Sequence, residues 1–323
     1  MPVLGLGYIG LEARDLDAWR QFGTEVLAMQ VIERGADVLA LRMDERCQRV
    51  LVQRGGNDAP AFFGFETSGA QAMQAAIGKL EAAGVSVTRG SEHELALRRV
   101  EAMAWCRDPS GNRIEIFHGQ ATGDQNGDGA LKLPRPHGGF RSGPLGMGHV
   151  VFHVEDIDAS ARFYRELMDL RLSDYMVKPY RLMFLRANPR HHSVALLQSP
   201  RSGVHHVMFE VLALDDVGRS YDAALENWRI GQTLGRHAND WVLSFYVFCP
   251  AGFMMEVGFG GRTLDEATWQ PREITHGGSM WGHDRLYLDE ERRRAANEVR
   301  RAVVKAGLGA PLQITHGQYN EVK

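Results

Sequence analysis

Two histidines and one glutamate in the second half of the chain have the residue types of a mononuclear metal site. His149, His206 and Glu256 each lie in a short apolar run of the kind that forms a β-strand. Two neutral imidazoles and one carboxylate on one side of an ion form the facial triad of non-haem Fe(II) enzymes. Such a triad leaves neighbouring positions open on the ion, two for a chelating substrate and one for O2. The three residues therefore predict a metal centre that binds two reactants at once.

Strand alternation explains how these three side chains can meet. Successive side chains point to opposite faces of a strand, so each ligand lies opposite an apolar face. That face consists, strand by strand, of Val150, Phe152 and Val154, then His205, Val207, Phe209 and Val211, then Phe253, Met255, Val257 and Phe259. We expect helices to cover the apolar faces and the ligands to converge inside a half-barrel. The alternation also predicts that His205 faces away from the metal.

A structural role is the simpler interpretation for any one of the three ligands taken alone. A single histidine in a strand is more often a hydrogen-bonded polar residue than a metal ligand, and a single buried glutamate can be an ion-pair partner. Three such residues on matching faces of three strands favour the metal site instead.

The chain contains an internal duplication with an offset of 141 residues. The offset carries residues 5–8 onto 146–149 and Glu115 onto Glu256. Because it persists from one end of the unit to the other, it predicts two homologous halves.

The first half keeps only the glutamate of the triad. Tyr8 and Phe62 stand where the second half has His149 and His206. We therefore expect the first half to bind no metal and Glu115 to be structural.

Each half is expected to contain two modules of one strand, one helix and three strands. The chain then has an α+β fold of four βαβββ modules, which form two similar domains that each contain a half-barrel. Asp15 and Asp156 are candidate N-caps, since a carboxylate can accept the free amide protons of a first helical turn. The expected elements include strands over 8–12, 38–43, 61–67, 149–154, 181–186 and 205–212, and helices over 16–27, 70–83, 157–167, 215–228 and 289–306.

These elements suggest three parts of the chain. We expect a metal-free domain over 1–135, a catalytic metal-binding domain over 136–288, and a C-terminal helix and tail over 289–323. Residues 120–141 are rich in Gly, Pro and Asp, which is typical of a linker or surface loop.

The composition is that of a globular protein and excludes several functions. The chain has 323 residues, of which 44% are hydrophobic and 24% charged, and a formal charge of −3. This balance offers no basic surface for nucleic acid, and no apolar run reaches the roughly 20 residues of a membrane helix. Three scattered cysteines without a Cys-x-x-Cys pair argue against disulfides and thiolate zinc sites. Because no signal peptide is recognisable, the sequence predicts a cytoplasmic protein without nucleic-acid or membrane partners.

The longer motifs of the chain resemble one enzyme family. These motifs are Gly146-Met-Gly-His149, Asn188-Pro-Arg-His-His192-Ser, His205-His206-Val-Met-Phe-Glu-Val, Leu234-Gly-Arg-His237-Ala-Asn-Asp240, Ser244-Phe-Tyr246, Met255-Glu256-Val-Gly258 and Met280-Trp-Gly-His283. In this order they are similar to the type I extradiol dioxygenases of the vicinal oxygen chelate superfamily, in particular the two-domain 2,3-dihydroxybiphenyl 1,2-dioxygenase branch. The resemblance covers residues 5–285.

The resemblance implies roles for individual residues. It makes His149, His206 and Glu256 the metal ligands, and it gives supporting positions to His192, His237, Asn239, Asp240 and Tyr246 and an O2 pocket to Val151 and Phe184. In that scheme Tyr246 or His237 hydrogen-bonds the anionic substrate oxygen. His192 stabilises negative charge on the oxygen reactant and donates a proton. Taken alone, each of these three residues also has a structural alternative, at the surface or in the core.

The resemblance also implies the reaction. Both atoms of O2 would enter a catechol, and the ring would open beside the two hydroxyls, in the degradation of an aromatic compound. The implied cofactor is Fe(II), with Mn(II) as the alternative because both ions accept this ligand set. The expected substrate is a substituted or bicyclic catechol, and the expected assembly is a homo-oligomer.

One region departs from the family pattern. The segment between His149 and His192 is shorter than in the biphenyl-type enzymes and contains Lys178 and Arg181. We hypothesise that one of these cations meets a carboxylated catechol such as a dihydroxycumate. The alternative is that both are solvated surface cations.

Three other functions compete with the dioxygenase. Gly5-x-Gly7-x-x-Gly10 matches a dinucleotide-binding motif, but the four preceding residues are too few for the strand that this motif requires. A metal-dependent lyase or isomerase of the same superfamily would need a fourth protein ligand. A non-catalytic binding protein of the superfamily would lack the triad.

Overall fold

The computed structural model describes residues 3–275 and 277–305, and its first half forms an eight-stranded sheet. The elements of this half are β1 (Val3–Ala13), α1 (Leu16–Glu25), β2 (Gln30–Glu33), β3 (Val38–Arg42), β4 (Val50–Arg54), β5 (Ala59–Thr67), α2 (Ala70–Ala82), β6 (Thr88–Arg89), α3 (Glu92–Arg98), β7 (Ala102–Arg107) and β8 (Arg113–His118). The three glycines of the dinucleotide-like motif lie inside β1, so they form no phosphate-binding turn.

The second half forms a ten-stranded sheet. Its elements are the short helix η1 (Gly143–Leu145), β9 (His149–Val154), α4 (Ile157–Arg162), the π-helical turn η2 (Phe163–Leu167), β10 (Arg171–Met176), β11 (Leu182–Arg186), β12 (Val194–Gln198), β13 (Gly203–Val211), α5 (Leu214–Asn227), β14 (Ile230–His237), β15 (Leu243–Phe248), β16 (Met254–Phe259), β17 (Arg272–Glu273), β18 (Ser279–Gly282) and α6 (Glu290–Lys305). Residue 306 of the expected C-terminal helix and the tail beyond it lie outside the described residues.

The two sheets share one strand order, which confirms the four-module fold. The first runs β2-β3-β4-β1-β5-β8-β7-β6, and the second runs β10-β11-β12-β9-β13-β16-β15-β14 with β17 and β18 added at its two edges. In each sheet the first strands of the two modules pair antiparallel at the centre. The duplication seen in the sequence is therefore a duplication of topology.

The helices begin within one residue of the expected positions, and two of them end two or more residues early. Asp15 and Asp156 each accept two amide hydrogen bonds in the first turn of the following helix. The helix expected over 16–27 ends at Glu25, and Ala28 has a positive φ of 53° that a continuing helix does not tolerate. The helix expected over 157–167 changes to a π-helical turn at Phe163.

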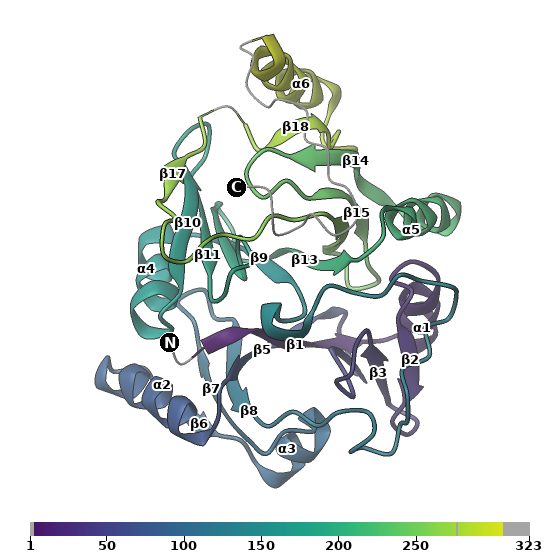
Figure 1. The fold of residues 1–323 in the computed structure, drawn as a ribbon, viewed down its shortest axis with the longest axis vertical. Helices are drawn as coiled ribbons and strands as arrows, with labels where there is room; N and C mark the ends of the chain where they lie inside the picture. Colours follow the sequence, from purple (N-terminus) through teal and green to yellow (C-terminus); the bar gives the residue numbers. More distant parts are fainter. Residues whose placement is uncertain (1–2, 276, 306–323) are drawn as a thin grey trace.

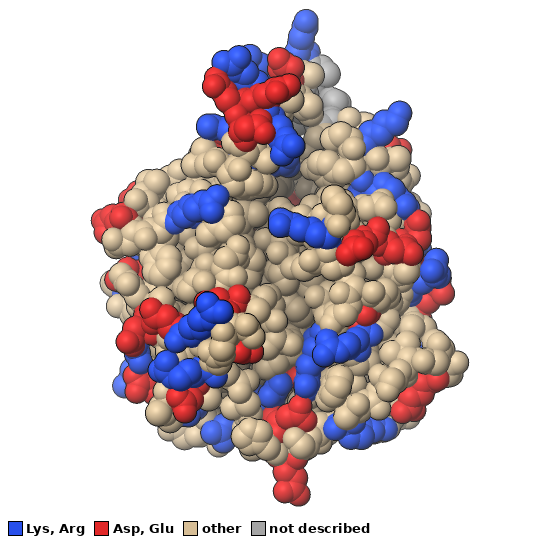
Figure 2. Space-filling model, turned by 180° about the vertical axis from the view of Figure 1, so that it is seen from behind, with Lys and Arg blue, Asp and Glu red and all other residues tan. Residues whose placement is uncertain are grey.

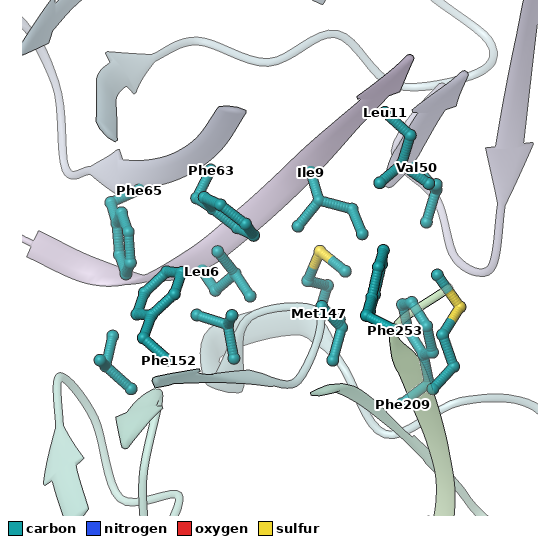
Figure 3. Close-up of a cluster of buried hydrophobic side chains, with 14 of the residues drawn as sticks. Leu6, Ile9, Leu11, Val50, Phe63, Phe65, Met147, Phe152, Phe209 and Phe253 are labelled. Carbon is teal, nitrogen blue, oxygen red and sulfur yellow. The ribbon is translucent and has the colours of Figure 1, made fainter. Parts of the chain in front are cut away.

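The two halves pack directly against each other (Figure 1). Leu6, Phe63 and Phe65 of the first half meet Met147 and Phe152 of the second half in one buried cluster (Figure 3). The rings of Phe63 and Phe152 lie 4.9 Å apart, edge to face. The expectation that helices cover the apolar faces was therefore incomplete, because each half also buries part of its apolar face against the other.

The surface in Figure 2 carries charged side chains of both signs, interspersed with uncharged ones. Within residues 3–275 and 277–305, no helix combines the length and the apolar composition needed to cross a membrane. Cys47, Cys106 and Cys249 are all buried and unpaired, as the sequence predicts.

Candidate metal centre and substrate cavity

His149, His206 and Glu256 converge at one point. The Nε2 atoms of the two histidines lie 3.1 Å apart, and they lie 3.4 and 3.2 Å from Oε2 of Glu256. All three side chains are buried. The donor atoms therefore form a nearly equilateral triangle, as the alternation of the strands predicts.

The register of three central strands produces this triangle. His149 of β9 lies opposite Met208 of β13, and Met208 lies opposite Glu256 of β16. His206 precedes Met208 by two residues and so shares its face of the sheet. Each ligand thus comes from a different strand, and the backbone hydrogen bonds of the sheet fix their separation.

The triangle has the size that a metal ion requires. Three donors at about 2.1 Å from an ion and at right angles to one another are separated by about 3.0 Å. Without an ion, two imidazole nitrogens would face each other and the same carboxylate oxygen across this short gap. The donor set therefore fits one divalent cation bound on one side by protein.

The charges around the triangle favour a cation as well. Burial tends to raise the pKa of Glu256, but hydrogen bonds with His149, His206 and His237 hold this pKa well below its ordinary value. Burial lowers the pKa of His149 despite the neighbouring carboxylate. An ionised carboxylate beside a neutral imidazole is the protonation state that metal binding needs.

Two neighbours orient the ligands. The Ser244 hydroxyl donates a hydrogen bond to Oε1 of Glu256 at 2.5 Å, which leaves Oε2 directed at the histidines. His205 Nδ1 lies 2.6 Å from His206 Nδ1. Contacts of this kind fix the ring orientation of a ligating histidine.

The prediction that His205 faces away from the metal was wrong. The pairing of β13 with β9 shifts by one residue between Val204 and His206, which is a β-bulge. The bulge interrupts the alternation of side chains, so His205 and His206 line the same cavity.

His237 and Tyr246 lie together beside the glutamate. His237 Nε2 is 2.6 Å from the Tyr246 hydroxyl and 3.4 Å from Oε1 of Glu256. Burial tends to lower the pKa of His237, but the Glu256 and Asp240 carboxylates raise it to about 9. Burial and the same two carboxylates raise the pKa of Tyr246 well above its ordinary value, so its hydroxyl keeps its proton.

His192 lies on the other side of the triangle, with its ring centre 3.8 Å from that of His149. Burial, reinforced by His149 and His191, holds the pKa of His192 well below its ordinary value. His192 Nδ1 lies 3.1 Å from His191 Nδ1 and 3.9 Å from Asp240 Oδ2. The residue is therefore a buried neutral imidazole next to the triangle.

A cavity of about 410 Å³ opens onto the triangle. Its walls include the triad and seven further residues for which the sequence suggests a role in the site, namely Val151, Phe184, His192, His237, Asn239, Asp240 and Tyr246. The structure therefore brings ten of the twelve candidate site residues together around one space.

Lys178 and Arg181 do not belong to this group. Neither side chain lines the cavity. The guanidinium of Arg181 donates two hydrogen bonds to the Asp158 carboxylate on the outside of the protein, at 2.9 and 2.6 Å. The hypothesis that one of them meets a carboxylated substrate was therefore wrong for these two residues.

The structure adds residues that the sequence interpretation missed. Ser244 and His283 occur in the quoted motifs without a role, although Ser244 contacts Glu256 and His283 Nε2 lies 3.2 Å from the Ser244 hydroxyl. Arg201 and Arg285 line the cavity but lie far apart in the sequence. No motif of fixed spacing joins these two arginines.

The comparison with known proteins agrees with this site. The sequence matches the family described as Glyoxalase/Bleomycin resistance protein/Dioxygenase superfamily over residues 146–257 and Dihydroxybiphenyl dioxygenase BphC D1 over residues 6–55. An iron-dependent extradiol dioxygenase of Rhodococcus jostii (strain RHA1) is 40% identical over 301 residues, covering 88% of this chain and 98% of the relative. A biphenyl-2,3-diol 1,2-dioxygenase of Sphingomonas paucimobilis is 36% identical over 297 residues, covering 88% and 97%.

A solved structure agrees as well. The crystal structure of BphC, a halotolerant catechol dioxygenase, superposes with a TM-score of 0.83 at 33% identity, over 88% of this chain and 95% of that one. Because the likeness spans both modules of both halves, the chain belongs to the extradiol dioxygenase family.

Proposed function

We propose that this protein cleaves the ring of a substituted or bicyclic catechol beside its two hydroxyls, with O2 as the oxidant and one Fe(II) ion held by His149, His206 and Glu256. The observation that carries the proposal is the triangle of donor atoms, 3.1 to 3.4 Å on a side, which faces a cavity. The described residues add no fourth protein ligand to the triangle, so an ion there keeps positions for both reactants.

The residues around the triangle supply the remaining chemistry. The chemistry that bound Fe(II) supplies is the joint binding of the catechol oxygens and O2 and the passage of electrons between them. The Tyr246 hydroxyl keeps its proton and can donate a hydrogen bond to an anionic catechol oxygen. His237, 2.6 Å from that hydroxyl and with its pKa raised to about 9, carries a proton at neutral pH and can help to stabilise the anionic catechol oxygen.

His192 can act on the oxygen side of the site. A neutral imidazole carries one N–H; His192 Nδ1 already contacts His191 Nδ1, so the role proposed here places the proton on Nε2, from which it can donate a hydrogen bond to an oxygen atom as negative charge develops there. The same group can then transfer a proton to the departing oxygen. Its contact with His149 supports placing this step beside the metal position.

The apolar side chains control access. Val151 and Phe184 line the cavity, and the Phe184 ring lies 4.9 Å from that of His192. An apolar wall at this point leaves room for O2 but offers no hydrogen bonds to water. We infer that these two residues keep the reacting oxygen dry.

The size of the cavity supports a catechol with a substituent. A volume of about 410 Å³ falls within the roughly 300–1,000 Å³ of pockets that hold drug-sized ligands. A single unsubstituted ring would leave much of it empty. A relative of this chain carries the name biphenyl-2,3-diol 1,2-dioxygenase, which is in keeping with a larger substrate.

The proposal is tested on protein purified without oxygen. Metal analysis should find about one Fe per chain, and only the Fe-loaded protein should consume O2 with a catechol and form a yellow ring-opened product. Reloading with Mn(II) decides between the two ions, and light scattering decides whether the protein is the homo-oligomer we infer from its family. A protein that binds Fe(II) but leaves every catechol of a varied panel intact would contradict the proposal.

A further inference from the structure

The wall of the cavity contains two arginines that have no role in the proposed reaction. Arg201 and Arg285 line the same space as the triad. Within residues 3–275 and 277–305, neither forms an ion pair with a carboxylate. The acidic residues of the cavity wall are Asp240 and Glu256, and both lie at the metal triangle. Neither carboxylate of the wall is therefore paired with Arg201 or Arg285.

The two arginines belong to a distal cluster formed by Tyr180, Arg201, Arg285 and Tyr287. The guanidinium of Arg285 donates a hydrogen bond to the Tyr180 hydroxyl at 3.3 Å. The Tyr287 hydroxyl interacts electrostatically with both arginines and with Tyr180. All four side chains line the cavity. The cluster thus collects two cations and two hydroxyls in one part of the wall.

The sheet places this cluster at a defined separation from the metal triangle. Glu256 lies opposite Tyr246, Tyr246 opposite Gln232, and Gln232 forms a bridge with Arg285. Three strand spacings therefore separate the backbones of Glu256 and Arg285, which is about 14 Å along the sheet. The Arg285 side chain lines the cavity, but its backbone is far from that of Glu256. Its guanidinium is therefore placed to meet a group on a substituent of the catechol and not the catechol oxygens themselves.

The bonding of Arg285 differs from that of the arginines with structural roles. Arg190 donates to the Glu210 carboxylate and to the backbone oxygens of Leu145 and Arg141. Arg285 instead has one long hydrogen bond to a neutral hydroxyl and faces open space. A guanidinium in that position has several N–H groups left to donate. Their planar, forked arrangement matches the two oxygens of a carboxylate.

We propose that the distal cluster binds a carboxylate on the substituent of the catechol, with Arg285 as the residue that determines this specificity. The inference rests on the proposed ring cleavage and names its substrate class, a catechol whose side chain ends in a carboxylate. The cations involved are not Lys178 and Arg181, which lie outside the cavity.

The test compares an acid with its neutral analogue of the same shape. We would measure kcat/KM for 3-(2,3-dihydroxyphenyl)propanoate and for the corresponding propanamide, and repeat the pair with shorter and longer side chains. Hydrogen bonds to a charged group contribute enough for a preference of about 10- to 100-fold for the acid. Anaerobic calorimetry of both compounds gives a binding readout that does not depend on turnover.

Three variants assign the preference to its residue. R285M should reduce the acid-to-amide ratio to near one, with the iron content unchanged. R285K, which keeps the charge but not the fork, should retain part of the ratio. R181M removes a guanidinium outside the cavity, so it is the matched control and should behave like the unmodified protein.

The outcomes separate the two proposals. If the protein cleaves the acid and the amide equally well, or if R285M lowers both to the same extent, the distal cluster does not select a carboxylate, and the ring-cleavage proposal stands. If the Fe-loaded protein cleaves no catechol at all, the proposed function and the inference built on it are both overturned. A lost preference in R285M with an unchanged R181M supports the inference.

Discussion

The two halves of the molecule place a glutamate at the same point of the same sheet topology but surround it differently. In the first sheet, one row across the strands contains Tyr8, Gly64 and Glu115. The equivalent row in the second sheet contains His149, Met208, Glu256 and Tyr246. Both carboxylates are almost fully inaccessible, at 0% and 1% exposure. The backbone therefore offers the same position twice, and the neighbouring side chains decide its use.

In the first half, protein groups take the place of a metal. The Glu115 carboxylate accepts hydrogen bonds from Tyr8 at 2.8 Å, from Arg98 at 2.9 and 3.1 Å, and from Arg113 at 2.9 Å. The Tyr8 ring lies over Gly64, which has no side chain. A Cβ atom added at Gly64 would lie 2.3 Å from the Tyr8 ring. The position is thus filled by aromatic side chains and neutralised by guanidinium groups, in agreement with the expected structural role of Glu115.

In the second half, the carboxylate faces the imidazoles of His149, His206 and His237 and a cavity. Burial lowers the pKa of His149, so its ring supplies a lone pair and not a positive charge. Within the described residues, no arginine donates to Glu256 as Arg98 does to Glu115. The comparison teaches that a buried glutamate needs positive charge nearby: two arginines supply it to Glu115, and under the proposed function a metal ion supplies it to Glu256.

Removing one ligand should give the largest difference between the halves. In H206A the triangle loses one of its three donors, so iron content should fall and ring cleavage should drop by roughly 1,000-fold or more. The matched change in the first half is F62A, which should leave iron content intact. Metal analysis and O2 uptake on both variants check this, and an H206A protein that keeps its iron would show that the ion binds elsewhere.

Neutralising the first-half glutamate should affect stability and not chemistry. In E115Q the buried guanidinium of Arg98 loses its charged partner, which should lower the free energy of unfolding by about 3–5 kcal/mol. Iron content and kcat per folded molecule should stay the same. Denaturant unfolding and metal analysis measure the two effects, and a loss of iron in E115Q would remove the distinction between the two sites.

Chelation of the metal should destabilise the protein through the second half alone. An ion at a hundredfold excess over its Kd contributes about 2.7 kcal/mol, so its removal should lower Tm by roughly 4 °C. The decrease should be the same in E115Q and should vanish in H206A, because only H206A lacks the site. Thermal scans at one heating rate, with and without a chelator, test this, and an equal shift in H206A would contradict it.

The smallest expected effect comes from removing one hydroxyl in each half. Y246F loses the hydroxyl that we assign to the catechol oxygen, so kcat/KM should fall by about 10- to 100-fold with unchanged iron content. Y8F loses the hydroxyl that donates a hydrogen bond to Glu115 in the first half and should keep its kcat/KM. Steady-state kinetics on the pair would show whether Tyr246 has a role beyond packing, since equal values for both variants would argue that it has none.

Much of the site could be predicted because it depends on local rules. His149 and Glu256 follow from the alternation of side chains in regular strands. The equivalence of Tyr8 with His149 follows from a constant offset, and the strand register confirms it. His192, His237 and Tyr246 required a family resemblance, since a single histidine or tyrosine does not reveal its neighbours.

The errors arise where local rules stop applying. The bulge between Val204 and His206 moved His205 onto the cavity side, and alternation cannot foresee an extra residue in a strand. Arg181 lies close in sequence to residues of the cavity wall, but its pairing with Asp158 turns it outward.

The sequence by itself determined the duplicated topology, the candidate ligand triad and the absence of that triad from the first half, because each depends on residue type and on periods of a few residues. The tertiary structure alone decided which cations face the substrate cavity. Arg201 and Arg285 line the same cavity although they lie far apart in the sequence, and Arg285 reaches it because the segment after β18 pairs with β14. Such proximity depends on how segments that are distant in the sequence pack together, and no short-range sequence pattern predicts that packing.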